Sequence, residues 1–198
     1  MAAAAGIYHT NPQIVFLADD KNLGEFSDEF KNQLYLLEER PDNDQRSATN
    51  FGNSEDVKGT EKMLEKIGEE NDHRVDQESW VRARLFDMFL SDWGRHEDQW
   101  RWATFKKNDY TIYKPIPRDR DQSYTKFDGF IVKKLAPSPA LGYLTSFDYT
   151  IKDISNYNYQ ARHLDRRLAN EPSRATWMDI AKDLQQKLTD SIIEFSVK

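Results

Sequence analysis

The sequence predicts a mixed α+β fold, and three observations carry this prediction. An apolar run (QIVFLA, residues 13–18) lies near the start, two aromatic-rich strands with a short turn span residues 100–116, and amphipathic helical patterns dominate the rest. Strands and helices occur in separate groups along the chain rather than in regular alternation, which indicates α+β. The 198 residues suffice for one domain or one and a half, at about 150 residues per domain.

The N-terminal part is predicted to hold two strands. Gln13 to Ala18 is continuously apolar, which is typical of a strand buried on both faces. Asp19 to Lys31 is polar and favours a short helix or a loop. Leu34 to Leu37 is the second apolar run, and Pro41, which has no N–H to donate, ends it. The stretch from Asp42 to Ser54 is rich in Asn, Asp, Ser and Gly and is predicted to be a loop.

Two helices are predicted next. Val57 to Glu70 has one apolar face, and Thr60 is its expected N-cap. Gln77 to Leu90 follows Asp76, a favourable N-cap residue, and has a wide apolar face. The second helix is therefore expected to be central.

A β-hairpin is predicted after the central helix. Its strands are Trp100 to Phe105 and Tyr110 to Ile116, joined by a turn of two lysines, Asn and Asp. Phe127 to Leu135 is expected to be a further strand or an extended segment. A break is predicted at Pro137-Ser138-Pro139.

The C-terminal part is predicted to be helical. One helix is expected from Tyr157 to Ala169 and a second from Ser173, as N-cap, to Leu188. Thr189 to Lys198 either continues the second helix or begins another.

Composition excludes several classes of function. With 28 Lys and Arg against 34 Asp and Glu, the net charge of −6 disfavours broad attraction to nucleic acid. The absence of cysteine excludes disulfides, thiol nucleophiles and cysteine-bound zinc. No apolar run approaches the roughly 20 residues that span a bilayer, so no transmembrane segment is predicted. The alanine-rich start lacks the pattern of a signal peptide.

Two polar clusters flank the predicted hairpin. The first extends from Asp92 to Trp100, directly after the central helix, and the second is Arg118-Asp119-Arg120-Asp121. Because a hairpin folds back on itself, its two ends are neighbours. We therefore expect Asp98 or Gln99 to approach Asp119 or Asp121.

Oxygen ligands that converge from two loops are typical of a Mg²⁺ or Mn²⁺ site. The candidate metal ligands are Gln99, Asp98, Asp119 and Asp121, and Asp121 is favoured over Asp119. Arg95 and His96 are candidates for neutralising a phosphate group. The alternative interpretation is that these residues form ion pairs at strand ends beside a core margin of tryptophans.

The order of elements resembles the C-lobe of a protein kinase of the atypical kind. There a central helix leads into a catalytic loop of the form Asp-Arg-His-x-x-Asn, and a hairpin then delivers a metal-binding Asp. Arg95 and His96 match this loop, and Gln99 takes the place of the amide. The resemblance implies that residues 1–41 are partial N-lobe strands and a hinge, and that residues 42–198 are a mainly helical C-lobe-like region with a central hairpin. It also implies that the hinge residues Glu38, Glu39 and Arg40 contact ATP.

Five longer strings resemble an uncharacterised domain of Bacteroidota envelope proteins. They are GIYHTNP (6–12), LLEERP (36–41), ARLFDM (83–88), RHEDQWRW (95–102) and PIPRDRDQ (115–122). In that family the domain often accompanies a calcineurin-like metallophosphoesterase domain and a BamA-like outer-membrane barrel. The resemblance implies a location in the bacterial cell envelope and either of those domains as a partner.

Two departures from these families bear on activity. The family loop reads Asp-Trp-Asp-Arg-His, whereas this chain has Gly94 at the second Asp, the expected catalytic base. The chain also has no Gly-x-Gly phosphate loop. Asp92 is then the best remaining base, with Arg95 and His96 as its catalytic partners.

The sequence thus predicts a truncated or degenerate kinase-like domain that binds Mg²⁺ or Mn²⁺ and ATP and, if active, transfers a phosphoryl group. A non-catalytic scaffold of an outer-membrane-associated protein and a metal-dependent phosphate hydrolase are the alternatives.

Overall fold

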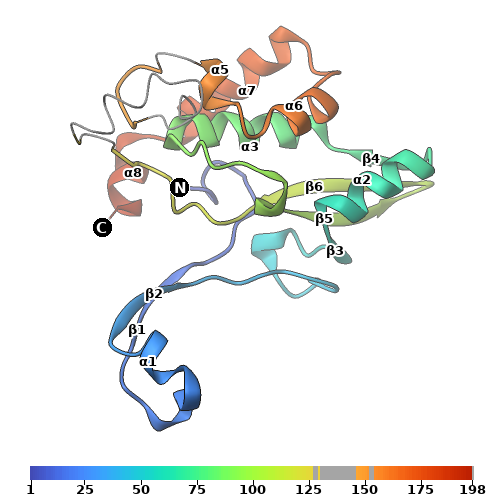
Figure 1. The fold of residues 1–198 in the computed structure, drawn as a ribbon. Helices are drawn as coiled ribbons and strands as arrows, with labels where there is room; N and C mark the ends of the chain where they lie inside the picture. Colours follow the sequence, from blue (N-terminus) through green and yellow to red (C-terminus); the bar gives the residue numbers. More distant parts are fainter. Residues whose placement is uncertain (127–128, 130–145, 152–153, 198) are drawn as a thin grey trace.

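The computed structural model describes residues 1–126, 129, 146–151 and 154–197, and it confirms a mixed α+β fold (Figure 1). In the body, helices pack against one face of a four-stranded sheet, and a two-stranded arm projects from this body. The predicted strand over 127–135 and the predicted break at 137–139 fall almost wholly outside the described residues.

The central sheet is built on the predicted hairpin. Strands β5 (Trp100–Lys107) and β6 (Tyr110–Pro117) pair in antiparallel register, with Trp100 opposite Pro117. Two edge strands that the sequence did not predict complete the order β3-β5-β6-β4. β3 (Asp56–Gly59) is antiparallel to β5, and β4 (His73–Val75) is parallel to β6.

Helix α3 (Gln77–Leu90) has the predicted bounds. The Asp76 carboxylate accepts a hydrogen bond from the backbone N–H of Ser79 at 2.9 Å and caps the first turn. The helix ends at Ser91, whose positive φ of 61° turns the chain away and returns its N–H to carbonyls of the last turn. This reversal sends residues 92–96 toward the start of β5.

Helix α2 (Thr60–Glu69) begins later than predicted. Residues 57–59 belong to β3, and Gly59 occupies the N-cap position. The expectation that Thr60 caps this helix is wrong, because its hydroxyl instead donates to the carbonyl of Glu97 at 2.8 Å. The indole of Trp102 donates to the same hydroxyl.

Three apolar clusters fill the body, and one of them consists of Phe51, Val57, Ala103 and Ile116. In another, Trp80 of α3 stacks on Trp102 of β5 at a ring-centroid distance of 5.5 Å and packs against Trp100 in a tilted arrangement at 4.5 Å. The third cluster joins α3 to helix α7 (Arg174–Lys187) and includes Ala5 and Ile7 from the N-terminus. The N-terminal residues therefore belong to the body, although the predicted boundary grouped them with the arm.

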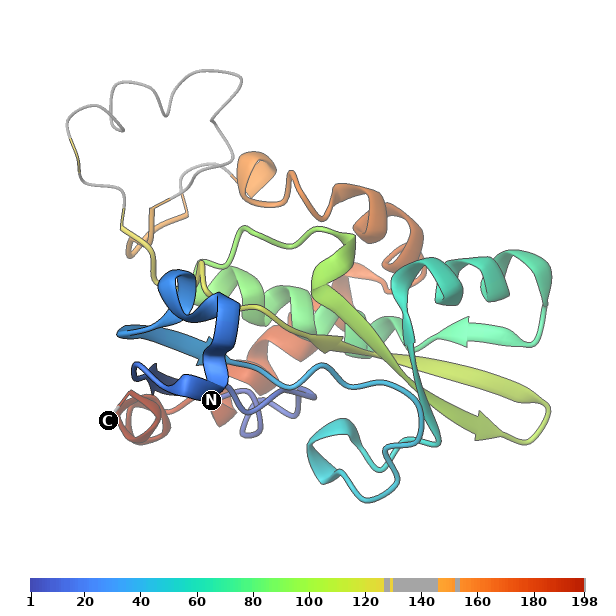
Figure 2. The ribbon, with the colours of Figure 1, turned by 60° about the horizontal axis from the view of Figure 1, so that its bottom comes forward.

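The C-terminal region contains more helices than predicted. The single helix expected over 157–169 is replaced by α5 (Ile154–Tyr157) and α6 (Arg162–Leu168). Ser173 caps α7 as predicted, since its hydroxyl accepts from the N–H of Thr176. A separate helix, α8 (Asp190–Ser196), follows, and the amino group of Met1 donates to its Ser196 hydroxyl at 2.9 Å (Figure 2).

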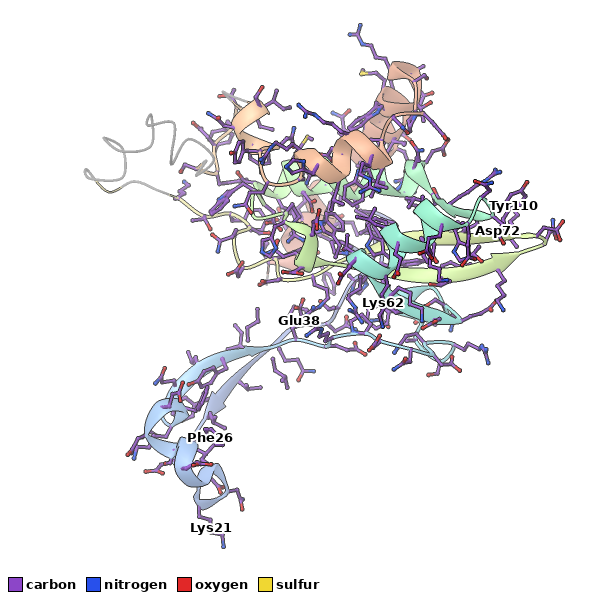
Figure 3. All side chains as sticks on the ribbon, turned by 45° about the vertical axis from the view of Figure 1, so that its right-hand side comes forward. Lys21, Phe26, Glu38, Lys62, Asp72 and Tyr110 are labelled. Carbon is purple, nitrogen blue, oxygen red and sulfur yellow. The ribbon has the colours of Figure 1, made fainter. Side chains whose placement is uncertain are left out.

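The arm consists of two antiparallel strands, β1 (Gln13–Leu17) and β2 (Gln33–Leu37). A 3-10 helix, η1 (Lys21–Phe26), and a short α-helix, α1 (Ser27–Phe30), connect the two strands. Figure 3 shows it extending from the body, with Lys21 and Phe26 at the far end and Glu38 at its root.

One face of the arm is apolar and open to solvent. Ile14 lies opposite Leu36 and Phe16 opposite Leu34 in the hairpin register. The exposed fractions of Ile14 and Leu34 are 76% and 69%. The prediction that Gln13 to Ala18 is buried on both faces is therefore wrong. An apolar run favours burial, but among the described residues no element covers this face.

We expect substitutions on this face to leave stability nearly unchanged. Phe16→Ser should alter the free energy of unfolding by no more than about 0.5 kcal/mol, because the ring is 61% exposed. Phe51→Ala removes a ring that is fully buried in the body and should cost about 3–5 kcal/mol. Urea denaturation of both variants measures the difference. A loss above about 1 kcal/mol for Phe16→Ser would contradict an exposed arm.

Candidate functional site

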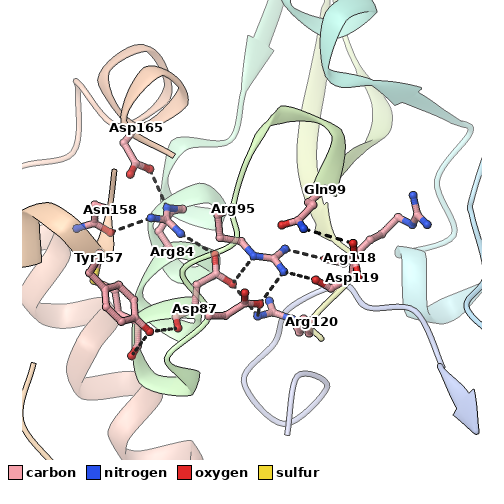
Figure 4. A network of polar contacts seen from close by, with 12 residues as sticks. Arg84, Asp87, Arg95, Gln99, Arg118, Asp119, Arg120, Tyr157, Asn158 and Asp165 are labelled. Carbon is pink, nitrogen blue, oxygen red and sulfur yellow. Dashed lines mark hydrogen bonds and ion pairs between the residues drawn. The ribbon is translucent and has the colours of Figure 1, made fainter. Parts of the chain in front are cut away.

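The loop after α3 is held by a buried network of charged side chains (Figure 4). Three arginines and three aspartates take part, so that positive and negative charges balance. They are Arg84, Asp87, Asp92, Arg95, Arg120 and Asp165. Buried charges of this kind need partners of opposite sign, because removal from water is costly.

Asp87, on the last turn of α3, is the centre of this network. Its carboxylate is fully buried and accepts from Nη1 of Arg84 at 2.8 Å and from Nη1 of Arg120 at 2.7 Å. The Arg84 guanidinium also donates to Asp165 at 2.9 Å, which connects α3 to α6. The network thus joins the end of the central helix to the segment after β6 and to the C-terminal helices.

Asp92 is the predicted base, and its position argues against that role. Its side chain is fully buried, and Oδ2 accepts from Nη2 of Arg95 at 2.6 Å. Burial raises the pKa of Asp92, while the neighbouring Arg95 guanidinium acts in the opposite direction. A carboxylate enclosed in this way serves an ion pair and is not presented to a substrate hydroxyl.

Arg95 anchors the segment that follows β6. Its guanidinium donates to the carbonyl of Arg118 at 2.8 Å and to the carbonyl of Asp119 at 2.9 Å. Because Arg95 is itself fully buried, this geometry argues against direct contact with a phosphate group. His96, the next residue, is exposed.

The two ends of the hairpin meet as predicted, at Gln99 and Asp119. Nε2 of Gln99 donates to Oδ2 of Asp119 at 3.3 Å. The amide oxygen of Gln99 is buried and has no hydrogen-bond partner among the described residues. Asp121, which the sequence favoured, instead accepts from Nε2 of Gln122 at 3.0 Å. The structure therefore places Asp119 beside Gln99.

A polar cleft of about 680 Å³ opens beside the start of α2. Asp98 and Trp100, the residues on either side of Gln99, line it, together with Arg40 of the predicted hinge. The other charged lining residues have both signs: Lys58, Lys62, Arg101 and Arg167 are basic, and Asp42, Glu61 and Glu97 are acidic. Of the other hinge residues, Glu39 is exposed, and Glu38 faces the Asp119 backbone, whose N–H donates to Oε1 at 3.0 Å.

A second group of possible metal ligands lies at the opposite end of α2 and was not predicted. One ligand atom each of Glu70, Asp72 and His73 lies within 4.8 Å of the others. His73 also contacts the hydroxyl of Tyr113 through Nδ1 at 2.6 Å. The Glu-x-x-His spacing of Glu70 and His73 was the sequence signal for this cluster. The spacing alone did not indicate that a turn also places Asp72 beside these two residues.

Comparison with protein-family models, with curated proteins and with solved structures finds no match to this chain. Among the residues that the structure describes, no helix is long and apolar enough to cross a membrane.

Proposed function

We propose that this chain carries a degenerate kinase-like site, which binds Mg²⁺ or Mn²⁺ together with ATP through Gln99 and Asp119. The observation that supports this most is the contact between these two side chains at the ends of the hairpin, where Nε2 of Gln99 lies 3.3 Å from Oδ2 of Asp119. The element order of central helix, loop, hairpin and acidic segment agrees with the same interpretation.

The chemistry of the donors fits such a metal. The Gln99 amide oxygen is a buried acceptor without a partner among the described residues, and Nε2 of the same amide donates to the Asp119 carboxylate. A flip of this amide would turn its oxygen toward Asp119. Mg²⁺ is commonly held by one or two protein oxygens and completed by phosphate and water. When bound, the ion would neutralise charge on the phosphate groups.

The cleft beside Asp98 supports nucleotide binding. Arg40, Lys62 and Arg167 lie along it and can pair with a polyphosphate, although the five basic side chains of the cleft face four acidic ones. Its volume of about 680 Å³ lies within the usual range for small-molecule sites.

The site has no well-placed base. Gly94 has no side chain that accepts a proton, and Asp92 is enclosed by its ion pair with Arg95. We therefore propose binding of metal and nucleotide without efficient phosphoryl transfer. A metal-dependent hydrolase would use the same oxygen ligands but would bind metal without needing nucleotide.

The second candidate function is a scaffold, and the exposed apolar face of the arm favours it. Four large apolar side chains from β1 and β2 lie on this face, and surfaces of this kind commonly mark interaction sites. A location in the bacterial envelope, with a phosphoesterase or an outer-membrane barrel domain as partner, follows from the family resemblance and remains a proposal.

Thermal unfolding with Mn²⁺, with ATP and with both tests the proposal. We expect stabilisation when both are present, of about 2.7 kcal/mol at about a hundred times the Kd, or about 5–10 °C in Tm. Asp119→Asn should abolish it. Asp121→Asn is the matched control, because it removes the same charge two residues away and should retain the shift.

The Glu70–Asp72–His73 cluster needs a separate control. His73→Ala removes its imidazole ligand, so a shift that persists in this variant does not arise there. A shift with Mn²⁺ alone that is lost in Asp119→Asn favours the hydrolase. If no condition shifts the Tm, the metal–nucleotide proposal fails and the scaffold is the better account.

A further inference from the structure

We propose that Glu38 is the positioning residue of this site: it holds Asp119 in the conformation that turns its carboxylate toward Gln99. This inference rests on the proposed function, because it assigns Asp119 to the metal. It also changes the part expected of Glu38, from contact with ATP to support of a metal ligand.

The Glu38 carboxylate is nearly buried, with 14% of the side chain exposed, and it accepts hydrogen bonds from three residues. The backbone N–H of Asp119 donates to Oε1 and Oε2 at 3.0 and 3.3 Å. The Arg118 guanidinium donates to Oε2 at 3.2 Å, and the hydroxyl of Thr10 donates to Oε1 at 2.6 Å. Both oxygens are therefore engaged.

Asp119 needs this support because its backbone is left-handed, with a φ of 52°. Aspartate tolerates this region better than most residues, but the conformation is still disfavoured in an open chain. Glu38 holds the N–H of Asp119, and Arg95 holds its carbonyl at 2.9 Å. The peptide groups on both sides of the Asp119 Cα are thus restrained, and the side chain is directed to Gln99.

Glu38 also connects the arm to the site. It directly follows β2, and Thr10, its hydrogen-bond partner, precedes β1 by three residues. The two strands of the arm therefore meet the body at the same carboxylate that holds Asp119. Figure 3 places Glu38 at this root.

The adjacent Glu39 provides a matched control. It is the same residue type and is exposed, so Glu39→Gln removes an equal charge without touching Asp119. Glu38→Ala removes both acceptors, whereas Glu38→Gln keeps one carbonyl oxygen for the Asp119 N–H and should rescue part of the function.

Binding of Mn²⁺, followed by the EPR signal of the free ion, tests the role. Every protein carries His73→Ala, so that the Glu70–Asp72–His73 cluster does not take up the probe. We expect Glu38→Ala to weaken Mn²⁺ affinity by about tenfold or more, as loss of a group supporting a metal ligand does. Glu38→Gln should weaken it less, and Glu39→Gln should leave it unchanged.

Amide hydrogen exchange without metal supplies a readout that a general loss of stability does not imitate. In Glu38→Ala and Glu38→Gln the Asp119 amide should exchange faster while amides of the β5–β6 hairpin stay protected. Unchanged exchange at Asp119, or wild-type Mn²⁺ affinity in Glu38→Ala, overturns the inference and leaves the proposed function standing. Wild-type protein that binds no Mn²⁺ overturns the metal site itself, and with it the role of Glu38.

Discussion

Replacing Gly94 by aspartate is expected to raise phosphotransfer from ATP by about a hundredfold or more over the unsubstituted chain, because a positioned base typically contributes that much. Gly94 lies in the loop between α3 and β5, and its φ is outside the left-handed range, so a side chain causes no backbone strain. The substitution would restore a carboxylate where this chain has none.

Gly94 is buried, and the space around it admits a Cβ after a small adjustment. An added Cβ would lie 3.1 Å from Cγ of Gln122, a flexible chain that must move by a few tenths of an ångström. The same Cβ would lie 3.8 Å from Nε2 of Gln99, so the substitution adds its side chain next to a proposed metal ligand.

Transfer of labelled phosphate from ATP, with Mn²⁺ present, measures the gain. Gly94→Asn is the matched control, because it has nearly the same shape but accepts no proton at neutral pH. Equal activity in the two variants, or no gain in either, would show that the missing base is not what limits this site.

Asp87→Asn is expected to produce the largest loss of stability, about 3–5 kcal/mol, because it leaves the buried Arg84 and the partly buried Arg120 without their shared counter-charge. Both Arg84 and Arg120 donate to Asp87 within 2.8 Å. Burial lowers the pKa of Arg120, and the Asp87 carboxylate acts in the opposite direction because it stabilises the charged guanidinium. The Arg84 side chain is 1% exposed and the Arg120 side chain 20% exposed, so water compensates little for the lost carboxylate at Arg84 and only partly at Arg120.

Urea denaturation gives the free energy of unfolding for this comparison. Asp179→Asn is the control, since its carboxylate is 77% exposed and only loosely paired with Lys182 at 3.9 Å, so a change within about 0.5 kcal/mol is expected. If the two variants lose similar amounts, the network contributes no more than surface pairs do, and its role in holding the loop is excluded.

Local signals in the sequence were sufficient for several elements. Asp76 is followed directly by the apolar pattern of α3, and Ser173 stands in the same relation to α7, so both helix starts were predicted correctly. The hairpin of β5 and β6 was equally clear, because its strands pair with each other across a short turn. That pairing also made the approach of Gln99 to Asp119 predictable, since the ends of a hairpin coincide.

Other parts depended on contacts between distant residues. β3 and β4 have four and three residues, too few for a recognisable pattern, and each is a strand because it pairs with an edge of the hairpin. The run from Gln13 to Ala18 was expected to be buried because it is apolar, but burial also requires a covering surface.

The features of the candidate site also fall into two groups, those that follow from the local sequence and those that depend on contacts between distant residues. The sequence is sufficient to show which side chains near the hairpin ends carry oxygen atoms and that Gly94 supplies no carboxylate in the loop, because these are matters of residue type and short-range geometry. Three features require contacts in the folded chain. Asp119 rather than Asp121 faces Gln99, and Asp92 forms a buried ion pair with Arg95. Glu38 accepts a hydrogen bond from the backbone N–H of Asp119, 81 residues away. Burial and hydrogen-bond partners are properties of the packed chain, since the groups that supply them come together only when the arm, the central helix and the hairpin meet.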